Sequence, residues 1–69
     1  MKSWLEVARD ASNLSPEDCA SAMKCSRATY MSREATPGRL SLDEISRIMP
    51  VLSKEGRRVV YRALDNLKV

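Results

Sequence analysis

The amino-acid sequence predicts an all-α fold, a compact bundle of five short helices. Apolar residues recur at helical spacing in five separate segments, and four of these segments follow a serine that can act as an N-cap. β-branched residues never alternate with polar ones over a useful length, so strands are not supported. The chain has 69 residues, of which 43% are hydrophobic and 30% charged, as in one ordinary globular domain. We therefore expect a single domain over residues 1–69.

Two helices are expected in the first 24 residues. The first covers about residues 3–12 and ends at Asn13, with an apolar stripe of Trp4, Leu5, Ala8 and Ala11. The second begins at Ser15, because Pro16 suits the first helical position and Asp18 resembles the reciprocal half of a capping box. It stops near residue 23 or 24. Its inward face is expected to comprise Cys19, Ala20 and Met23.

A third helix is expected over about residues 27–35, with Ser26 as its N-cap. Tyr30 is its only large apolar anchor, and Pro37 and Gly38 terminate it. Its other positions are mostly small, polar or basic. Because few of them suit a core, this helix is expected to present an exposed polar face to solvent or to a ligand.

The last two helices have clear start signals. The segment SLDE predicts a capping box between Ser41 and Glu44, and Pro50 predicts a kink or an early end near residue 49. The apolar residues of this fourth helix are Leu42, Ile45, Ile48, Met49 and Leu52. The fifth helix begins after Ser53 and covers about residues 54–67. Its apolar stripe comprises Val59, Val60, Ala63, Leu64 and Leu67.

The sequence contains no pattern typical of an enzyme. There is no histidine and no glycine-rich phosphate loop, and neither Cys19 nor Cys25 has an evident base partner. The spacing of these two thiols fits neither a zinc site nor a CxxC redox motif, so we expect them to be reduced and buried. We expect no catalytic residue, no metal, no other cofactor and no small-molecule substrate.

No membrane span is predicted, because the chain lacks a run of about 18 apolar residues. Its start reaches acidic residues too soon to hold the apolar core of a signal peptide. We therefore expect a cytoplasmic protein.

Charge is distributed unevenly along the chain. The net charge is +3, which is mild. Residues 24–39 contain four basic residues and one acidic residue, a net +3, whereas residues 1–23 contain two basic and four acidic residues, a net −2. This polarity suits an anionic partner on one face. A solvated surface with a chance imbalance is the alternative.

The second and third helices, joined by a tight turn, have the features that a helix-turn-helix requires. Ala20 provides a small residue where the two helices cross, and Met23 and Cys25 provide apolar residues beside the turn. The segments LSPEDCASAMKCSRATYMSRE and GRLSLDEISRIMPVL resemble the Cro and lambda-repressor-like family, also called Xre-type helix-turn-helix proteins. The resemblance covers roughly residues 4–52 and includes a glutamate, Glu34, at the end of the third helix.

Three positions depart from the family pattern. Lys24 stands where the family usually has a glycine in the turn, Tyr30 where it has a β-branched core residue, and Arg33 where it often has Trp, Ile or Leu. These departures concern the turn and the packing of the third helix. The other elements of the pattern remain in register.

The resemblance implies specific DNA contacts. The base-contacting residues would be Ser26, Arg27, Ala28, Met31 and Ser32. The phosphate-contacting residues would be Pro16, Glu17, Lys24, Thr29, Arg33 and Arg39. Arg27 is the strongest candidate, because its guanidinium can grip guanine at O6 and N7. Solvent exposure without a ligand is the alternative for Arg27 and Ser32, and surface or dimer packing for Met31. Arg57, Arg58 and Arg62 are expected to form a solvated face or to contact phosphates.

The function implied is a sequence-specific DNA-binding transcriptional regulator, a Cro-like repressor of bacterial or phage origin. It would act by occupying a double-stranded DNA operator as a homodimer, with one recognition helix in each of two major grooves. The candidate dimer residues are Val59, Val60, Leu64 and Leu67, unless this stripe closes the core of the monomer. The alternatives are a protein-interaction module that docks on a host or phage protein and an excisionase-like architectural DNA-binding protein.

Overall fold

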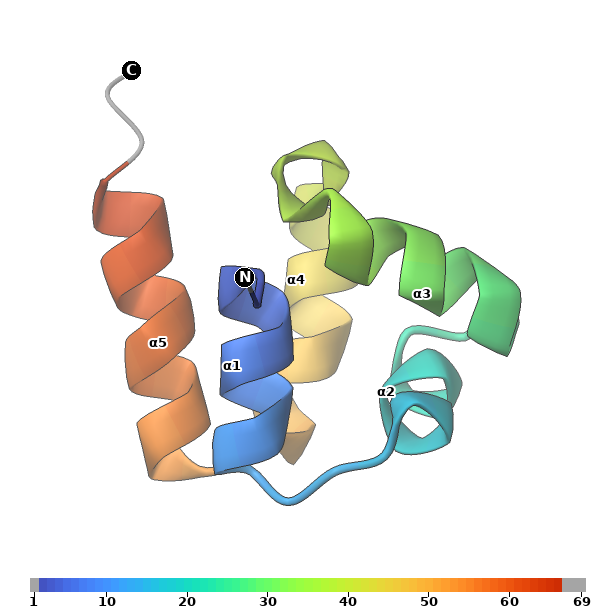
Figure 1. Ribbon diagram of the computed structural model, residues 1–69, viewed down its shortest axis with the longest axis horizontal. Coiled ribbons are helices and arrows are strands. Elements are labelled where there is room, and N and C mark those ends of the chain that lie inside the picture. Colours follow the sequence, from blue (N-terminus) through green and yellow to red (C-terminus); the bar gives the residue numbers. More distant parts are fainter. Residues whose placement is uncertain (1, 67–69) are drawn as a thin grey trace.

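The computed structural model describes residues 2–66 and confirms a compact all-α globule of five helices (Figure 1). No strand is present among these residues. The helices are α1 (Trp4–Ala11), α2 (Pro16–Ala22), α3 (Arg27–Ala35), α4 (Leu42–Ile48) and α5 (Lys54–Asp65). Two short 3-10 turns, η1 (Pro37–Arg39) and η2 (Met49–Val51), follow α3 and α4. The early end of α4 before Pro50 is therefore confirmed.

A serine N-cap precedes every one of these five α-helices. In each case the serine hydroxyl oxygen accepts a hydrogen bond from the backbone N–H three residues later. The capping residues are Ser3, Ser15, Ser26, Ser41 and Ser53. Both predicted capping boxes are present, at Ser15 with Asp18 and at Ser41 with Glu44. Each cap satisfies an N–H group that the helix itself leaves unpaired, which is why these short segments begin at these residues.

The core lies where the five helices meet. Its fully buried residues come from all of them and are Leu5, Ala8, Cys19, Ala20, Met23, Tyr30, Ile48, Leu52 and Val60. The predicted inward face of α2 is thus confirmed. Two predicted apolar positions are wrong, because Leu42 is 81% exposed and Ala11 is also exposed. Each lies at one end of its helix, Leu42 as the first residue of α4 and Ala11 as the last of α1.

Helices α1 and α5 lie side by side on one side of the molecule, and α2 and α3 lie on the other (Figure 1). The connection from α1 to α2 passes through Asn13, as predicted for the end of the first helix. Leu67, predicted to belong to the fifth helix, lies outside the described residues. This arrangement leaves α3 at the edge of the globule, away from α5.

The turn between α2 and α3 holds Lys24 in the left-handed region, with φ 56°. This is the position at which the resemblance leads one to expect glycine. We expect Lys24→Gly to raise the free energy of unfolding by about 0.5–1 kcal/mol. Relief of the left-handed penalty, about 1–2 kcal/mol, outweighs the added backbone entropy of glycine in the unfolded chain. Urea unfolding of the wild type and the variant measures the difference.

Asn13 is the matched control, since it has almost the same φ, 55°. Asparagine tolerates this conformation far better than lysine does, so Asn13→Gly should change the free energy of unfolding much less. A Lys24→Gly variant no more stable than the wild type would show that the turn is not strained.

Candidate nucleic-acid interface

One face of α3 points away from the core. Four of the five residues predicted to contact bases (Arg27, Ala28, Met31 and Ser32) share one arc of this helix at 3.6 residues per turn. All four are exposed, and so is Ser26 at the N-cap. Tyr30 and Glu34 are buried on the side of the helix that faces the core. Arg27 lies roughly 20° from Glu34 around the helix and is exposed as the first residue of α3. Helix α3 therefore has one buried stripe and one solvent-facing stripe of small, polar and basic side chains.

Helix α3 is held against α2 by a close crossing. Ala20 of α2 and Met23, its C-cap residue, are both buried, which brings the two backbones near each other. The backbone N–H of Cys25 donates to the Ala20 carbonyl oxygen over 3.0 Å and closes the turn. The end of α2 and the start of α3 are thus fixed relative to one another, which defines the angle at which the exposed face of α3 is presented.

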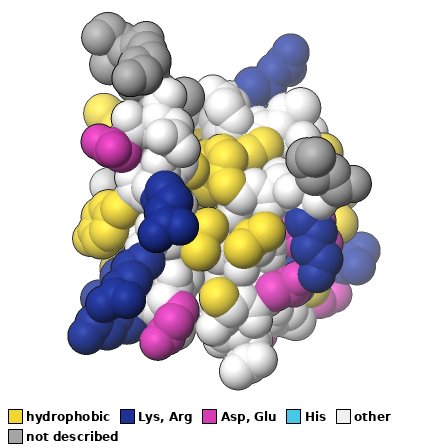
Figure 2. All heavy atoms as spheres, turned by 60° about the vertical axis from the view of Figure 1, so that its left-hand side comes forward, with side chains coloured by type: hydrophobic (Ala, Val, Ile, Leu, Met, Phe, Trp, Pro, Cys, Tyr) yellow, Lys and Arg dark blue, Asp and Glu magenta, His cyan; other side chains and the backbone are white. Residues whose placement is uncertain are grey.

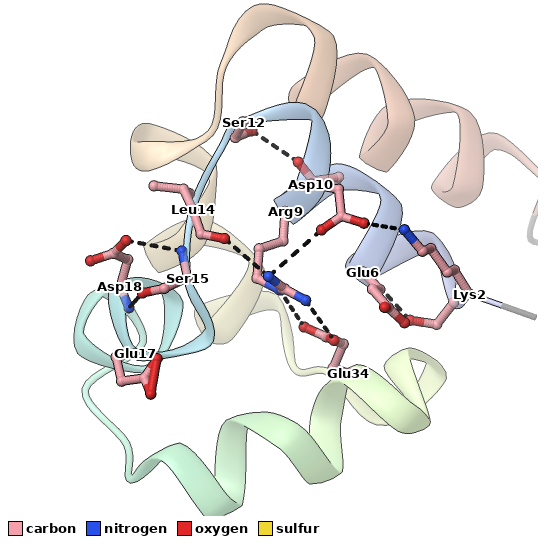
Figure 3. A network of polar contacts seen from close by, with 12 residues as sticks. Lys2, Glu6, Arg9, Asp10, Ser12, Leu14, Ser15, Glu17, Asp18 and Glu34 are labelled. Atoms are coloured by element: carbon pink, nitrogen blue, oxygen red, sulfur yellow. Dashed lines mark hydrogen bonds and ion pairs between the residues drawn. The ribbon is translucent and has the colours of Figure 1, made fainter.

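A buried ion pair fixes the other end of α3 (Figure 3). Arg9 Nε donates to Glu34 Oε2 over 2.9 Å, and Arg9 Nη1 donates to the Leu14 carbonyl oxygen over 3.0 Å. The two side chains are only 13% and 6% exposed. The Glu34 carboxylate raises the pKa of the Arg9 guanidinium still further above its ordinary value, so the arginine stays charged. Arg9 therefore links α1, the loop before α2, and α3.

Sequence reasoning assigned no role to Arg9. Helical periodicity shows which residues share a face, but it does not show which charged residue meets a glutamate 25 positions later. The sequence feature that indicates a cationic partner is Glu34, because a carboxylate that is buried beside a tyrosine requires a counterion.

The Tyr30 side chain fills the space beneath α3. It is fully buried, and its hydroxyl has no hydrogen-bond partner within residues 2–66. Burial raises the pKa of the Tyr30 phenol, and the neighbouring Glu34 and Cys19 side chains raise it further. Burial also raises the pKa of the Cys19 thiol. Both groups are therefore neutral at pH 7, and both serve the core.

The residues predicted to contact phosphates are in several different environments. Lys24 and Arg39 are exposed, and Arg33 forms an ion pair with Glu44 over 3.1 Å. The Thr29 hydroxyl oxygen accepts a hydrogen bond from the Ser26 hydroxyl over 3.0 Å. The Ser41 backbone N–H, together with Arg33, lowers the pKa of Glu44. Lys24 and Arg39 are thus the basic members of this set that are not engaged in an ion pair within residues 2–66.

The start of α2 carries negative charge. Pro16 is half-buried, whereas Glu17 is exposed and lies 2.7 Å from Arg27, measured from Glu17 Oε2 to Arg27 Nε. The Asp18 carboxylate accepts a hydrogen bond from the Ser15 backbone N–H over 3.0 Å, and this bond lowers the pKa of Asp18. Two carboxylates therefore surround the first turn of α2, where the resemblance implies phosphate contacts.

An apolar groove of about 580 Å³ lies between α1 and α5 (Figure 2). Its apolar lining comprises Trp4, Val7, Val59 and Ala63, and Arg58 and Arg62 of α5 also line it. Of the predicted dimer residues, Val59 is therefore accessible at this surface. Val60 is only 1% exposed and packs inside the protomer, and Leu64 is half-buried against the core. Leu67 lies outside the described residues.

The fold and this surface define a small all-α globule that presents one polar and basic helix face on one side and an apolar groove on the other. No family model, curated protein or solved structure matches this chain. Within residues 2–66, no helix is long and apolar enough to cross a membrane. In the same residues, no three or more Cys, Asp or Glu side chains gather as a group that could hold a metal ion.

Proposed function

We propose that this protein is a sequence-specific DNA-binding transcriptional regulator of the helix-turn-helix type. The observation that supports it is the exposed face of α3, on which every residue predicted to contact bases is accessible to a ligand. In this proposal α2 and α3 form the helix-turn-helix, and α3 enters the major groove, where an α-helix fits. The short side chains of Ala28 and Ser32 allow its backbone to approach the base edges closely.

Each exposed residue of α3 has a chemical role in this proposal. Arg27 donates hydrogen bonds to O6 and N7 of a guanine, and Ala28 or Met31 contacts the methyl group of a thymine. Lys24 and Arg39 contribute positive charge for phosphates on either side. Phosphate contacts set the register of the protein on DNA, and the base contacts set the sequence preference.

A homodimer completes the proposed function. Two copies would place two α3 helices in successive major grooves about 34 Å apart, so that the operator is palindromic. The apolar groove between α1 and α5 is the candidate dimer surface, with Trp4, Val7 and Val59 as its contact residues. Most of its lining residues belong to α5, which lies on the side of the molecule away from α3 (Figure 1). Operator occupancy that overlaps a promoter would then repress transcription in the cytoplasm.

The test is selection of bound duplexes from a randomised DNA pool at about 150 mM salt, because affinity depends steeply on salt. The wild type should enrich a palindromic consensus whose half-site spacing reports the dimer. Arg27→Ala should weaken the base preference at one position in each half-site, with a loss of about 1–3 kcal/mol in discrimination at that position. Arg47→Ala removes the same charge from an exposed position of α4 and should leave the consensus unchanged. Absence of enrichment for the wild type would contradict the proposal.

The groove between α1 and α5 also favours a second candidate, a protein-interaction module. Its apolar lining beside two arginines suits the apolar face of a partner helix. Such a module would retain its partner after Arg27→Ala and would show little salt-dependent affinity for DNA. The pool selection separates these two functions directly.

A further inference from the structure

The contact between Glu17 and Arg27 joins the two helices that the proposed function places against DNA. Glu17 Oε2 lies 2.7 Å from Arg27 Nε, and the two side chains are 60% and 59% exposed. Glu17 belongs to the first turn of α2, and Arg27 is the first residue of α3. The pair therefore spans the turn between these helices at the surface where base contacts are proposed.

This ion pair contributes little to folding. Solvent screens both charges, and two long side chains lose rotational freedom when they pair, so exposed pairs of this kind scarcely stabilise a protein. Asp18, the next residue, forms the capping box with Ser15 and so completes the helix start without Glu17. The carboxylate of Glu17 is thus dispensable for the cap.

The negative charge of Glu17 lowers the affinity of this surface for DNA. A glutamate carboxylate at the start of α2 repels phosphates, and its charge adds to that of the neighbouring Asp18. Every sequence carries phosphates, so this repulsion weakens binding to all DNA alike. A glutamate at position 17 therefore favours the function of a DNA-binding protein only if it improves discrimination between base sequences.

The geometry of the Glu17–Arg27 ion pair improves discrimination between base sequences. The closest contact is made through Arg27 Nε, which leaves the two terminal nitrogens of the guanidinium for the paired acceptors of a guanine. The ion pair also restricts the rotation of Arg27, so less freedom remains to be lost when the base contact forms. An Arg27 side chain that turned to a phosphate would have to leave Glu17.

We infer that Glu17 is a positioning residue that sets the sequence selectivity of Arg27, by orienting its guanidinium towards a base and by opposing phosphate contacts. This inference rests on the proposed function, since it assigns Arg27 to base reading. It changes the role of Glu17 from a phosphate contact to a determinant of specificity.

The test is Glu17→Gln, which keeps the shape of the side chain and removes its charge. The control is Asp43→Asn, because Asp43 occupies the second position of α4 as Glu17 does in α2, and is likewise exposed. Affinities for the selected duplex, for the same duplex with the Arg27-dependent base replaced, and for a random duplex are measured by fluorescence anisotropy at about 150 mM salt. The ratio of the first two affinities is the discrimination.

Glu17→Gln should bind random duplex about 3–10-fold more tightly than the wild type, since one opposing charge is gone. Its discrimination should fall about 3–10-fold, because Arg27 loses its orientation. Asp43→Asn should keep the wild-type discrimination. In the Arg27→Ala background, Glu17→Gln should cause no further loss of discrimination. Glu17→Gln and Asp43→Asn should unfold at similar temperatures, which excludes a folding defect.

The outcomes separate this inference from the proposed function. If the wild type discriminates and Glu17→Gln discriminates equally well, the role of Glu17 is refuted and DNA reading by α3 stands. If Glu17→Gln lowers discrimination just as much in the Arg27→Ala background, Glu17 does not act through Arg27. If the wild type shows no preference between the duplexes, both the inference and the proposed function fail.

Discussion

Replacing Arg9 with methionine should lower the free energy of unfolding by about 3–5 kcal/mol, the usual cost of removing one partner from a buried ion pair. Methionine fills much of the space of the arginine stem but cannot neutralise Glu34, whose side chain is only 6% exposed. The Glu34 carboxylate would then be a buried charge without a counterion. The Leu14 carbonyl oxygen would also lose the hydrogen bond from Arg9.

This loss is large for so small a protein. A domain of this size has a limited core, and its total stability is expected to be only several kcal/mol. The Arg9→Met variant should therefore be partly unfolded at 37 °C. Urea unfolding followed by far-UV circular dichroism measures the effect, because all five helices contribute to that signal.

A double variant distinguishes a buried charge from a packing defect. Arg9→Met combined with Glu34→Leu removes both charges, and most of the lost stability should return, since apolar replacements of buried pairs are often neutral or stabilising. The control is Lys2→Met, which breaks an ion pair with Asp10 whose side chains are 60% and 41% exposed. It should leave the free energy of unfolding nearly unchanged, because solvent screens this pair. A double variant no more stable than Arg9→Met would refute this explanation.

Replacing Gly56 with alanine should lower the free energy of unfolding by about 1–3 kcal/mol, although alanine normally favours a helix. Gly56 is buried where α5 crosses α1. A Cβ atom at this position would overlap Ser12 Oγ and lie 2.8 Å from the Ala8 carbonyl oxygen. Because the carbonyl belongs to the backbone of α1, the two helices would have to move apart.

The movement would also disturb hydrogen bonds at the same crossing. Ser12 Oγ donates to the Ala8 carbonyl oxygen over 2.9 Å and accepts from the Ser53 backbone N–H over 2.9 Å. The latter bond ties the start of α5 to the end of α1. Displacing Ser12 would therefore leave a partly buried N–H unpaired as well as opening the packing.

Gly38 provides the matched control for this substitution. It lies in η1, its φ is not positive, and a Cβ atom there would meet nothing within 4 Å. Gly38→Ala should leave the free energy of unfolding unchanged or raise it by up to about 1 kcal/mol, because alanine reduces the entropy of the unfolded chain. Thermal unfolding of both variants gives the comparison. Equal stability of Gly56→Ala and the wild type would show that α1 and α5 are not in close contact there.

The amino-acid sequence by itself determined where the helices begin and which face of α3 is exposed. The starts follow from serines whose hydroxyl groups reach an N–H only three residues away, so no distant part of the chain is needed. The exposure of Ala28 and Ser32 follows from helical period, since both lie at least about 120° around the helix from Tyr30 and Glu34. Arg27 lies on the same side as Glu34 and is exposed as the first residue of α3. These are local properties of the chain.

Tertiary structure alone decided which distant residues meet. The pairing of Arg9 with Glu34, the contact of Glu17 with Arg27, and the closeness of α1 and α5 at Gly56 each depend on how separate helices cross. The exposure of Leu42 has the same origin, because a local pattern cannot show where a helix extends beyond its neighbours. Helical periodicity specifies the faces of each helix, but the packing of side chains between helices specifies which faces come together.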